Sequence, residues 1–199
     1  MKFANPAPLG LFGFAVTTWM LCMFNVKWFG INTFPLMMAG AFCFGGAAQF
    51  IAGLMEYPRG NTFGMVAFCS YGTFWFAFAL YLMAFGGKGP LTYLGAWLIV
   101  WGAFTVVMWF ASLKLANRAL QLVLLTLWIA FFLLGASHLL NMDILHTIGG
   151  YVGLLTALLA FYAASAEVIN EVHGKTVLPI EAAPAQVNSK VRGKPVPST

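Results

Sequence analysis

Short polar segments divide the sequence into six apolar runs. Each run is long enough to cross a bilayer as a helix, in which every backbone polar group is satisfied internally. We predict transmembrane helices at Pro8–Phe24, Phe34–Met55, Thr62–Phe85, Leu91–Leu113, Asn117–Leu140 and Leu145–Ser165. The predicted fold class is therefore an all-α integral membrane protein.

An even number of spans puts both ends of the chain on one side of the membrane. Three spans per half would give two halves of inverted topology, an arrangement found in transporters. We assign residues 1–173 to the transmembrane domain. Residues 174–199 form a predicted cytoplasmic tail, which is expected to be largely disordered because it is too rich in proline and polar residues to fold alone.

The composition and the distribution of charge agree with a membrane protein. The chain is 61% hydrophobic and only 8% charged, whereas about a quarter of the residues in a soluble domain are charged. The basic residues on the side of the predicted termini are Lys2, Arg59, Lys114, Arg118, Lys175, Lys190, Arg192 and Lys194. The opposite side has only Lys27 and Lys88. The positive-inside rule then places both termini in the cytoplasm, in a bacterial inner membrane or an equivalent plasma membrane.

Acidic residues are expected at the ends of the spans or beyond them. They are Glu56, Asp143, Glu167, Glu171 and Glu181. Because no carboxylate falls in the middle of a predicted span, the sequence argues against a buried carboxylate relay or a cation site made of acidic side chains. A path between the spans is expected to have a neutral lining, which suits weak contact with a small carboxylic acid.

One pattern could indicate chemistry at the opposite side. His138, Asp143 and His146 form His-x4-Asp-x2-His across the predicted loop between the last two spans. This could be a metal site or proton relay of an intramembrane enzyme, but two interfacial histidines are the simpler interpretation. The three cysteines have no metal-site spacing. We therefore expect no enzyme activity, no bound metal and no cofactor.

Two polar side chains lie deep in predicted spans. Gln49 precedes Glu56 by two helical turns on the same face, and either an interhelical hydrogen bond or contact with a solute explains it. The phenol of Tyr71 needs a hydrogen-bond partner or water. At the start of the chain, Pro6 and Pro8 set where the first span begins, and Asn5 is expected to cap or tie down that start.

Several stretches resemble the motifs of the acetate uptake transporter family, the succinate–acetate permeases. They are Asn5-Pro6-Ala7-Pro8-Leu9-Gly10-Leu11, the segment Gly53–Gly64 with Glu-Tyr-Pro-Arg-Gly-Asn, the segment Ser70–Trp75, and Glu167–Glu171 followed by Gly174–Pro179. The resemblance covers about residues 4–180. It implies six spans, assembly as a hexamer with one path in each protomer, and transport of acetate and related short carboxylates, succinate included.

The resemblance also implies a hydrophobic constriction formed by Phe14, Tyr71 and Leu127. Counted from the predicted cytoplasmic ends of their spans, these residues lie roughly 9, 14 and 15 Å deep, and Gln49 lies roughly 10 Å deep. Four residues from four helices can therefore meet near one level.

The leading hypothesis is a path in which water is stripped from a small carboxylate. The groups expected to hydrogen-bond that carboxylate are Tyr71, Gln49, Thr17, Thr18 and Thr126. The basic residues expected to attract anions at the cytoplasmic face are Arg59, Lys114 and Arg118. The alternatives are a passive channel for small neutral solutes such as urea or ammonia, and a sensor or scaffold that transports nothing. Whether the path is a channel or a proton-linked carrier stays open.

Overall fold

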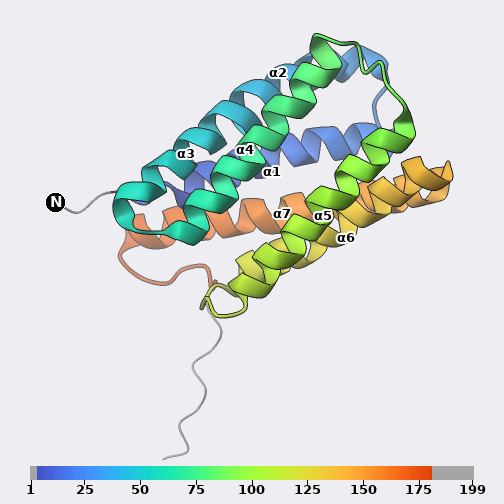
Figure 1. Ribbon diagram of the computed structural model, residues 1–199. Coiled ribbons are helices and arrows are strands. Elements are labelled where there is room, and N and C mark those ends of the chain that lie inside the picture. The colour runs from blue at the N-terminus through green and yellow to red at the C-terminus, as the bar shows by residue number, and fades with distance from the viewer. Residues whose placement is uncertain (1–3, 181–199) are drawn as a thin grey trace, which may run out of the picture.

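Residues 4–180 are the part of the chain that the computed structural model describes, and they fold into helices joined by short loops (Figure 1). The first span is α1 (Ala7–Asn25). The second consists of α2 (Phe34–Gly40), a π-helical stretch (Ala41–Ala48) and α3 (Gln49–Glu56). The others are α4 (Thr62–Met83), α5 (Leu91–Ser112), α6 (Arg118–Leu140) and α7 (Asp143–His173).

The six predicted spans are confirmed, and the second and the last are longer than predicted, the second covering Ile31–Arg59. Within residues 4–180, six helical segments are long and apolar enough to cross a membrane. The last span is longer than predicted, because α7 continues past Ser165 to His173. Gly174, with φ +62°, then ends the helix in the left-handed conformation that glycine adopts readily. Glu167 therefore lies inside a helix.

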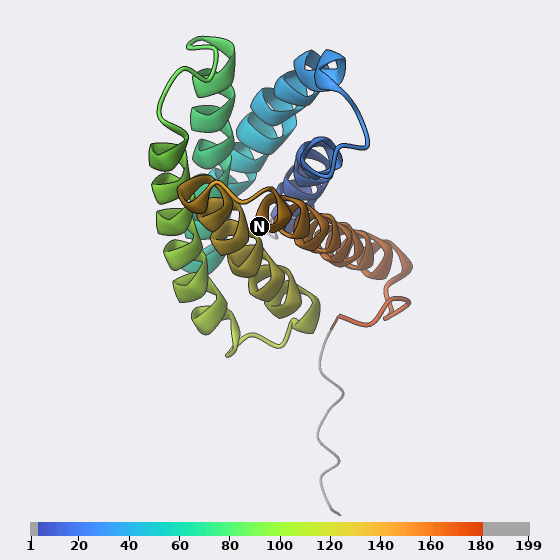
Figure 2. The same cartoon turned by 90° about the vertical axis from the view of Figure 1, so that its right-hand side faces the viewer.

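The helices follow one another around a ring in chain order (Figure 2). α6 packs against both α5 and α7, α3 packs against α4, and the first and last spans close the ring through an extensive α1–α7 contact. The contact between α4 and α5 is the smallest between neighbours in the ring. This arrangement leaves the centre of the ring available for a site lined by several spans.

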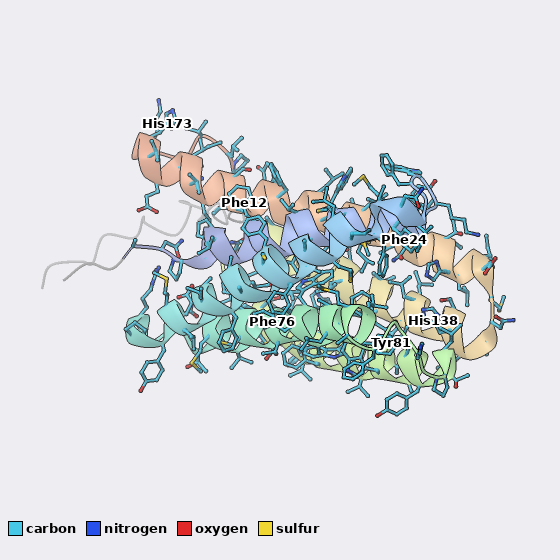
Figure 3. The ribbon with its side chains drawn as sticks, turned by 90° about the horizontal axis from the view of Figure 1, so that it is seen from above. Phe12, Phe24, Phe76, Tyr81, His138 and His173 are labelled. Carbon is cyan, nitrogen blue, oxygen red and sulfur yellow. The ribbon has the colours of Figure 1, made fainter. Side chains whose placement is uncertain are left out.

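The two ends of the bundle are easily distinguished. We call the end with His173 the termini face, and the end with His138 the distal face (Figure 3). The hydrogen bond from Asn5 Nδ2 to Glu167 Oε2, at 2.8 Å, joins the start of α1 to the last turns of α7. Both chain ends therefore leave the folded bundle at one face, as an even number of spans requires.

The C-terminal segment 174–180, which falls in the predicted tail, packs along the termini face. Asn170 Oδ1 accepts hydrogen bonds from the backbone N–H groups of Val177 and Leu178. The Tyr162 hydroxyl donates to Pro179 O, and Arg118 N donates to Ile180 O. The segment is thus tied to α6 and α7, while residues 181–199 of the predicted tail lie outside the described residues.

Small residues let α7 approach its two neighbours closely. The sequence contains a Gly-x3-Gly pattern at Gly149 and Gly153 that predicts a helix contact, and this prediction is confirmed. A Cβ at Gly149 would lie 2.9 Å from Leu134 Cγ of α6, and one at Gly153 would overlap Cys22 Sγ of α1. Gly153 therefore sets the distance between the first and last spans.

Replacing Gly153 with alanine is expected to destabilise the fold by about 1–3 kcal/mol, the usual range for an overpacked core. Cys22 is 2% exposed and has little room to move. Thermal unfolding in detergent measures the effect. Gly40→Ala is the matched control on a helix, because its added methyl would meet only the flexible end of Met20, at 3.3 Å. Equal melting temperatures for the two variants would contradict the close approach of α1 and α7.

Candidate functional site

Two cavities lie inside the ring of helices. The larger has a volume of about 470 Å³ and opens toward the termini face, and we call it the termini-side cavity. The smaller has a volume of about 90 Å³ and lies toward the distal face, and we call it the distal cavity. Polar residues found only in the first lining are Asn5, Gln49, Glu56, Asn61, Asn117 and Glu167. Those found only in the second include Thr18, Asn25, His138 and His146.

Three residues line both cavities and lie between them. They are Phe14 from α1, Tyr71 from α4 and Leu127 from α6. Each is 4–5% exposed, and the ring centroids of Phe14 and Tyr71 are 6.0 Å apart. The structure thus brings together the three residues selected by the family resemblance. That they constrict a transport path remains a prediction.

The hydroxyl of Tyr71 has a partner on the neighbouring helix. It donates to Thr105 Oγ1 of α5 at 3.0 Å, and the Thr105 hydroxyl donates to Trp101 O at 2.7 Å. Thr105 is fully buried. This hydrogen bond fixes the orientation of the Tyr71 ring. The phenol proton, which we expected to be donated to a substrate, is donated to Thr105 instead.

The wall of the distal cavity beside Tyr71 is aromatic. The ring of Phe74 stacks on Trp97 with centroids 4.9 Å apart, and it meets Trp101 and Phe131 edge-on at 5.2 and 5.4 Å. Offset and edge-to-face contacts of this kind hold aromatic side chains in fixed positions. The boundary between the cavities is therefore supported on the distal side by interlocked rings from α4, α5 and α6.

Of the other side chains predicted to hydrogen-bond a substrate, some line a cavity and some do not. Gln49 lines the termini-side cavity, is 1% exposed, and its Oε1 has no hydrogen-bond partner. Thr18 lines the distal cavity, also with an unpartnered hydroxyl. Thr17 instead donates to Gly40 O, and Thr126 donates to backbone carbonyls of its own helix and accepts from Thr156. Neither Thr17 nor Thr126 lines either cavity.

Two carboxylates that we expected at the membrane surface line the termini-side cavity, so the expectation of a neutral lining is wrong for this cavity. Glu56 is completely buried. The first turn of α4 packs onto it so closely that a Cβ at Gly64 would lie 3.0 Å from its carboxyl carbon. Glu167 enters the lining because α7 is longer than predicted. The positions of these acids along the spans are visible in the sequence, whereas the helix packing that encloses them is not.

The predicted basic rim is largely engaged in internal contacts. Arg59 Nη1 donates to Ala4 O at 2.9 Å and to Asn5 Oδ1 at 2.8 Å, and its Nε lies 3.6 Å from Glu56 Oε2. Arg118 donates to Gln121 Oε1 on the first turn of α6. Lys114 is exposed in the loop between α5 and α6. Asn5 ties down the start of α1, as predicted, because its Oδ1 also accepts from Ala7 N.

His138 and His146 do not form a three-residue site with Asp143. Their ring centroids are 5.5 Å apart, and both residues line the distal cavity. The Asp143 carboxylate is 96% exposed and faces Lys27, at 3.7 Å. Over residues 4–180, no group of three or more metal-binding side chains is found.

Three asparagines that were not among the predicted substrate-binding residues line the termini-side cavity. Asn5, Asn61 and Asn117 stand at the starts of α1, α4 and α6, and all three line the cavity. Asn61 Oδ1 accepts from Gly64 N, and Asn117 Oδ1 accepts from Leu120 N. An asparagine before each span that runs from the termini face to the distal face was the signal that could have located this cavity.

A family model described as the GPR1/FUN34/yaaH family matches residues 1–184. The chain belongs to this family. It is 46% identical over 186 residues to the succinate-acetate/proton symporter SatP of Escherichia coli K12, covering 90% of this chain and 96% of that protein. It is 36% identical over 210 residues to acetate permease A of Emericella nidulans, covering 96% of this chain and 70% of that protein.

A solved structure of this family has the same fold. The structure of the bacterial acetate channel SatP matches with a TM-score of 0.86 and 41% identity, covering 90% of this chain and 99% of that one. Members of the GPR1/FUN34/yaaH family named here are transporters or channels, not enzymes. Together with the six apolar spans, this makes the chain a multi-pass membrane transport protein.

Proposed function

We propose that this chain transports acetate and related short carboxylates, succinate among them, through a path inside each protomer. The observation that carries the proposal is the position of Phe14, Tyr71 and Leu127, which line both internal cavities. The names of its relatives, a symporter, a permease and a channel for acetate, support the choice of substrate.

In this proposal the three residues form an apolar constriction between two wider chambers. A narrow apolar segment excludes hydrated ions and can close by losing its water. A small carboxylate passes only after it has been desolvated, and buried amides then replace part of its hydration. Gln49 supports this role, because its side-chain amide lies in the termini-side cavity and can donate through Nε2 to a carboxylate.

The remaining features of the proposal concern the setting of the protein. We place it in the plasma membrane, the inner membrane if the cell is bacterial, with both termini cytoplasmic, which the excess of basic residues at the termini face supports. We also propose two three-span halves of inverted topology and a homohexamer, as the family resemblance implies.

Uptake of [14C]acetate into proteoliposomes tests the proposal. We expect uptake well above that of empty vesicles, and we expect excess unlabelled acetate or succinate to reduce it. Because acetic acid crosses lipid by itself, the comparison uses empty vesicles of the same lipid at the same pH. Uptake equal to that of empty vesicles, with folded protein present, would contradict the proposal. Flux of urea or ammonia that carboxylates leave unchanged would favour the neutral-solute channel.

A further inference from the structure

Glu56 is the least satisfied charged group in the termini-side cavity. The side chain is fully buried, and neither carboxylate oxygen has a hydrogen-bond partner. Its nearest cation is Arg59, whose Nε lies 3.6 Å from Oε2, beyond hydrogen-bond distance. The Arg59 Nη1 group is directed instead to Ala4 O and Asn5 Oδ1. A buried carboxylate without hydrogen bonds is costly in its charged form.

Glu167 faces the same cavity in a different environment. Its Oε2 accepts a hydrogen bond from Asn5 Nδ2 at 2.8 Å, and its Oε1 accepts one from Asn117 Nδ2 at 3.3 Å. Hydrogen bonds donated to a carboxylate favour its charged form. The cavity therefore contains one carboxylate held by two amides and another held by none.

The other charges near Glu56 do not cancel the negative charge of the pair. Arg59 follows it on the turn after α3 and reaches both Glu56 and Asn5. From α7, Glu167 faces the cavity, and Glu171 lies one turn beyond it, exposed. From the start of α4, the contacting groups are Asn61 and Gly64, which are neutral. Among the described residues that line the cavity, the charged ones are Glu56 and Glu167.

An anion that enters this cavity meets two carboxylates of the same sign. Like charges in a site of low dielectric constant repel strongly, and protonation of one of them removes the repulsion. Protonation of Glu56 gives up no hydrogen bond, whereas protonation of Glu167 would weaken the two that it accepts from Asn5 and Asn117. A proton on Glu56 and a carboxylate anion in the cavity therefore stabilise each other, and this coupling is reciprocal.

We propose that Glu56 is a proton-binding site, and that its protonation admits the substrate anion to the termini-side cavity. The inference rests on the proposed function, since it takes a small carboxylate as the ligand. The step forms and breaks one O–H bond. A proton from water binds a Glu56 carboxylate oxygen as the anion binds, and the proton returns to water when the anion leaves. Glu167 keeps its two amide donors, Asn5 and Asn117, throughout.

Binding of acetate to purified protein, measured by calorimetry in two buffers with different ionisation enthalpies, tests the proposal. The difference between the buffers gives the number of protons taken up for each acetate bound. We expect proton uptake by the wild type and none by Glu56→Gln, which mimics the protonated form. We also expect the Kd of the wild type to rise with pH by about 5–150-fold, the usual range of coupling between two sites, and that of Glu56→Gln to change by less than about twofold.

Three further variants make the result specific. Glu171→Gln is the matched control, because this exposed carboxylate lies on α7 outside the cavity lining, and it should behave like the wild type. Glu56→Asp keeps a carboxyl group and should keep the proton uptake. Glu167→Gln should keep it as well, and loss of uptake in this variant alone would assign the proton to Glu167 and overturn the proposal.

Infrared difference spectra of the wild-type protein give a second test that does not depend on the folding of a variant. Adding acetate should produce the carbonyl band of a protonated carboxylic acid, and this band should stay in place when 13C-labelled acetate is used. A band that shifts with the label belongs to the substrate and would overturn the proposal, as would acetate binding without proton uptake. If acetate does not bind at all, the result would instead contradict the proposed function.

Discussion

Replacing Phe14 with alanine is expected to raise the uptake of lactate relative to that of acetate. Phe14 is one of the three side chains shared by the two cavities, so its removal widens the boundary without moving Tyr71 or Leu127. Lowering the steric barrier for lactate by about 1.4 kcal/mol would raise its flux about tenfold. The ratio of [14C]lactate to [14C]acetate uptake in proteoliposomes measures the change.

Phe12→Ala provides the matched control for this experiment. Phe12 lies two residues earlier in α1, packs edge-on against Phe161 of α7 with ring centroids 5.1 Å apart, and lines neither cavity. We expect it to leave the lactate-to-acetate ratio unchanged. If Phe14→Ala folds normally, as judged by size-exclusion chromatography, and also leaves the ratio unchanged, Phe14 does not limit the size of the substrate.

Replacing Leu127 with tryptophan is expected to reduce acetate flux to the level of empty vesicles. Leu127 is 5% exposed and lines both cavities, as Phe14 and Tyr71 do. The indole ring would fill the remaining gap, and an added barrier of about 3 kcal/mol slows passage by more than about 100-fold. The larger side chain has room in the adjacent cavities, so the fold should survive. Uptake of [14C]acetate by the purified variant measures the effect.

Leu122→Trp is the control on the same helix. Leu122 is 47% exposed and faces away from both cavities, so the same substitution there should leave acetate uptake near that of the wild type. Normal uptake by Leu127→Trp would place the narrowest point elsewhere. Loss of uptake by both variants would indicate a general effect of tryptophan on α6 and would not support a constriction at Leu127.

The spans could be predicted from the sequence because apolar length alone determines which segments can cross a bilayer. The end of α7 was missed because Ala166–His173 mixes polar and apolar residues, so hydropathy falls while the helix continues to Gly174. Tertiary contacts at the termini face, such as Asn5 with Glu167, stabilise those turns. Such contacts between residues far apart in the sequence leave no trace in a local pattern.

The candidate site was only partly predictable. The family resemblance supplied Phe14, Tyr71 and Leu127, and their similar depths made a meeting plausible, but depth does not give the direction of a side chain. Thr17 and Thr126 have suitable depths and face backbone carbonyls of helices instead. Glu56 stands at the end of α3, where sequence position indicates exposure, and the packing of α4 at Gly64 buries it.

The π-helical stretch Ala41–Ala48 affects how the second span can change in length. Its i→i+5 hydrogen bonds put more residues into each turn than an α-helix has. Deleting one residue from this stretch would let the backbone return to α-helical hydrogen bonding, while α2 and α3 keep the same sides turned toward the rest of the bundle. Losing one residue inside α3 would turn Glu56 by about 100° relative to Gln49. Insertions and deletions among relatives should therefore collect at residues 41–48, where the span can change length and still present the same face to the cavity.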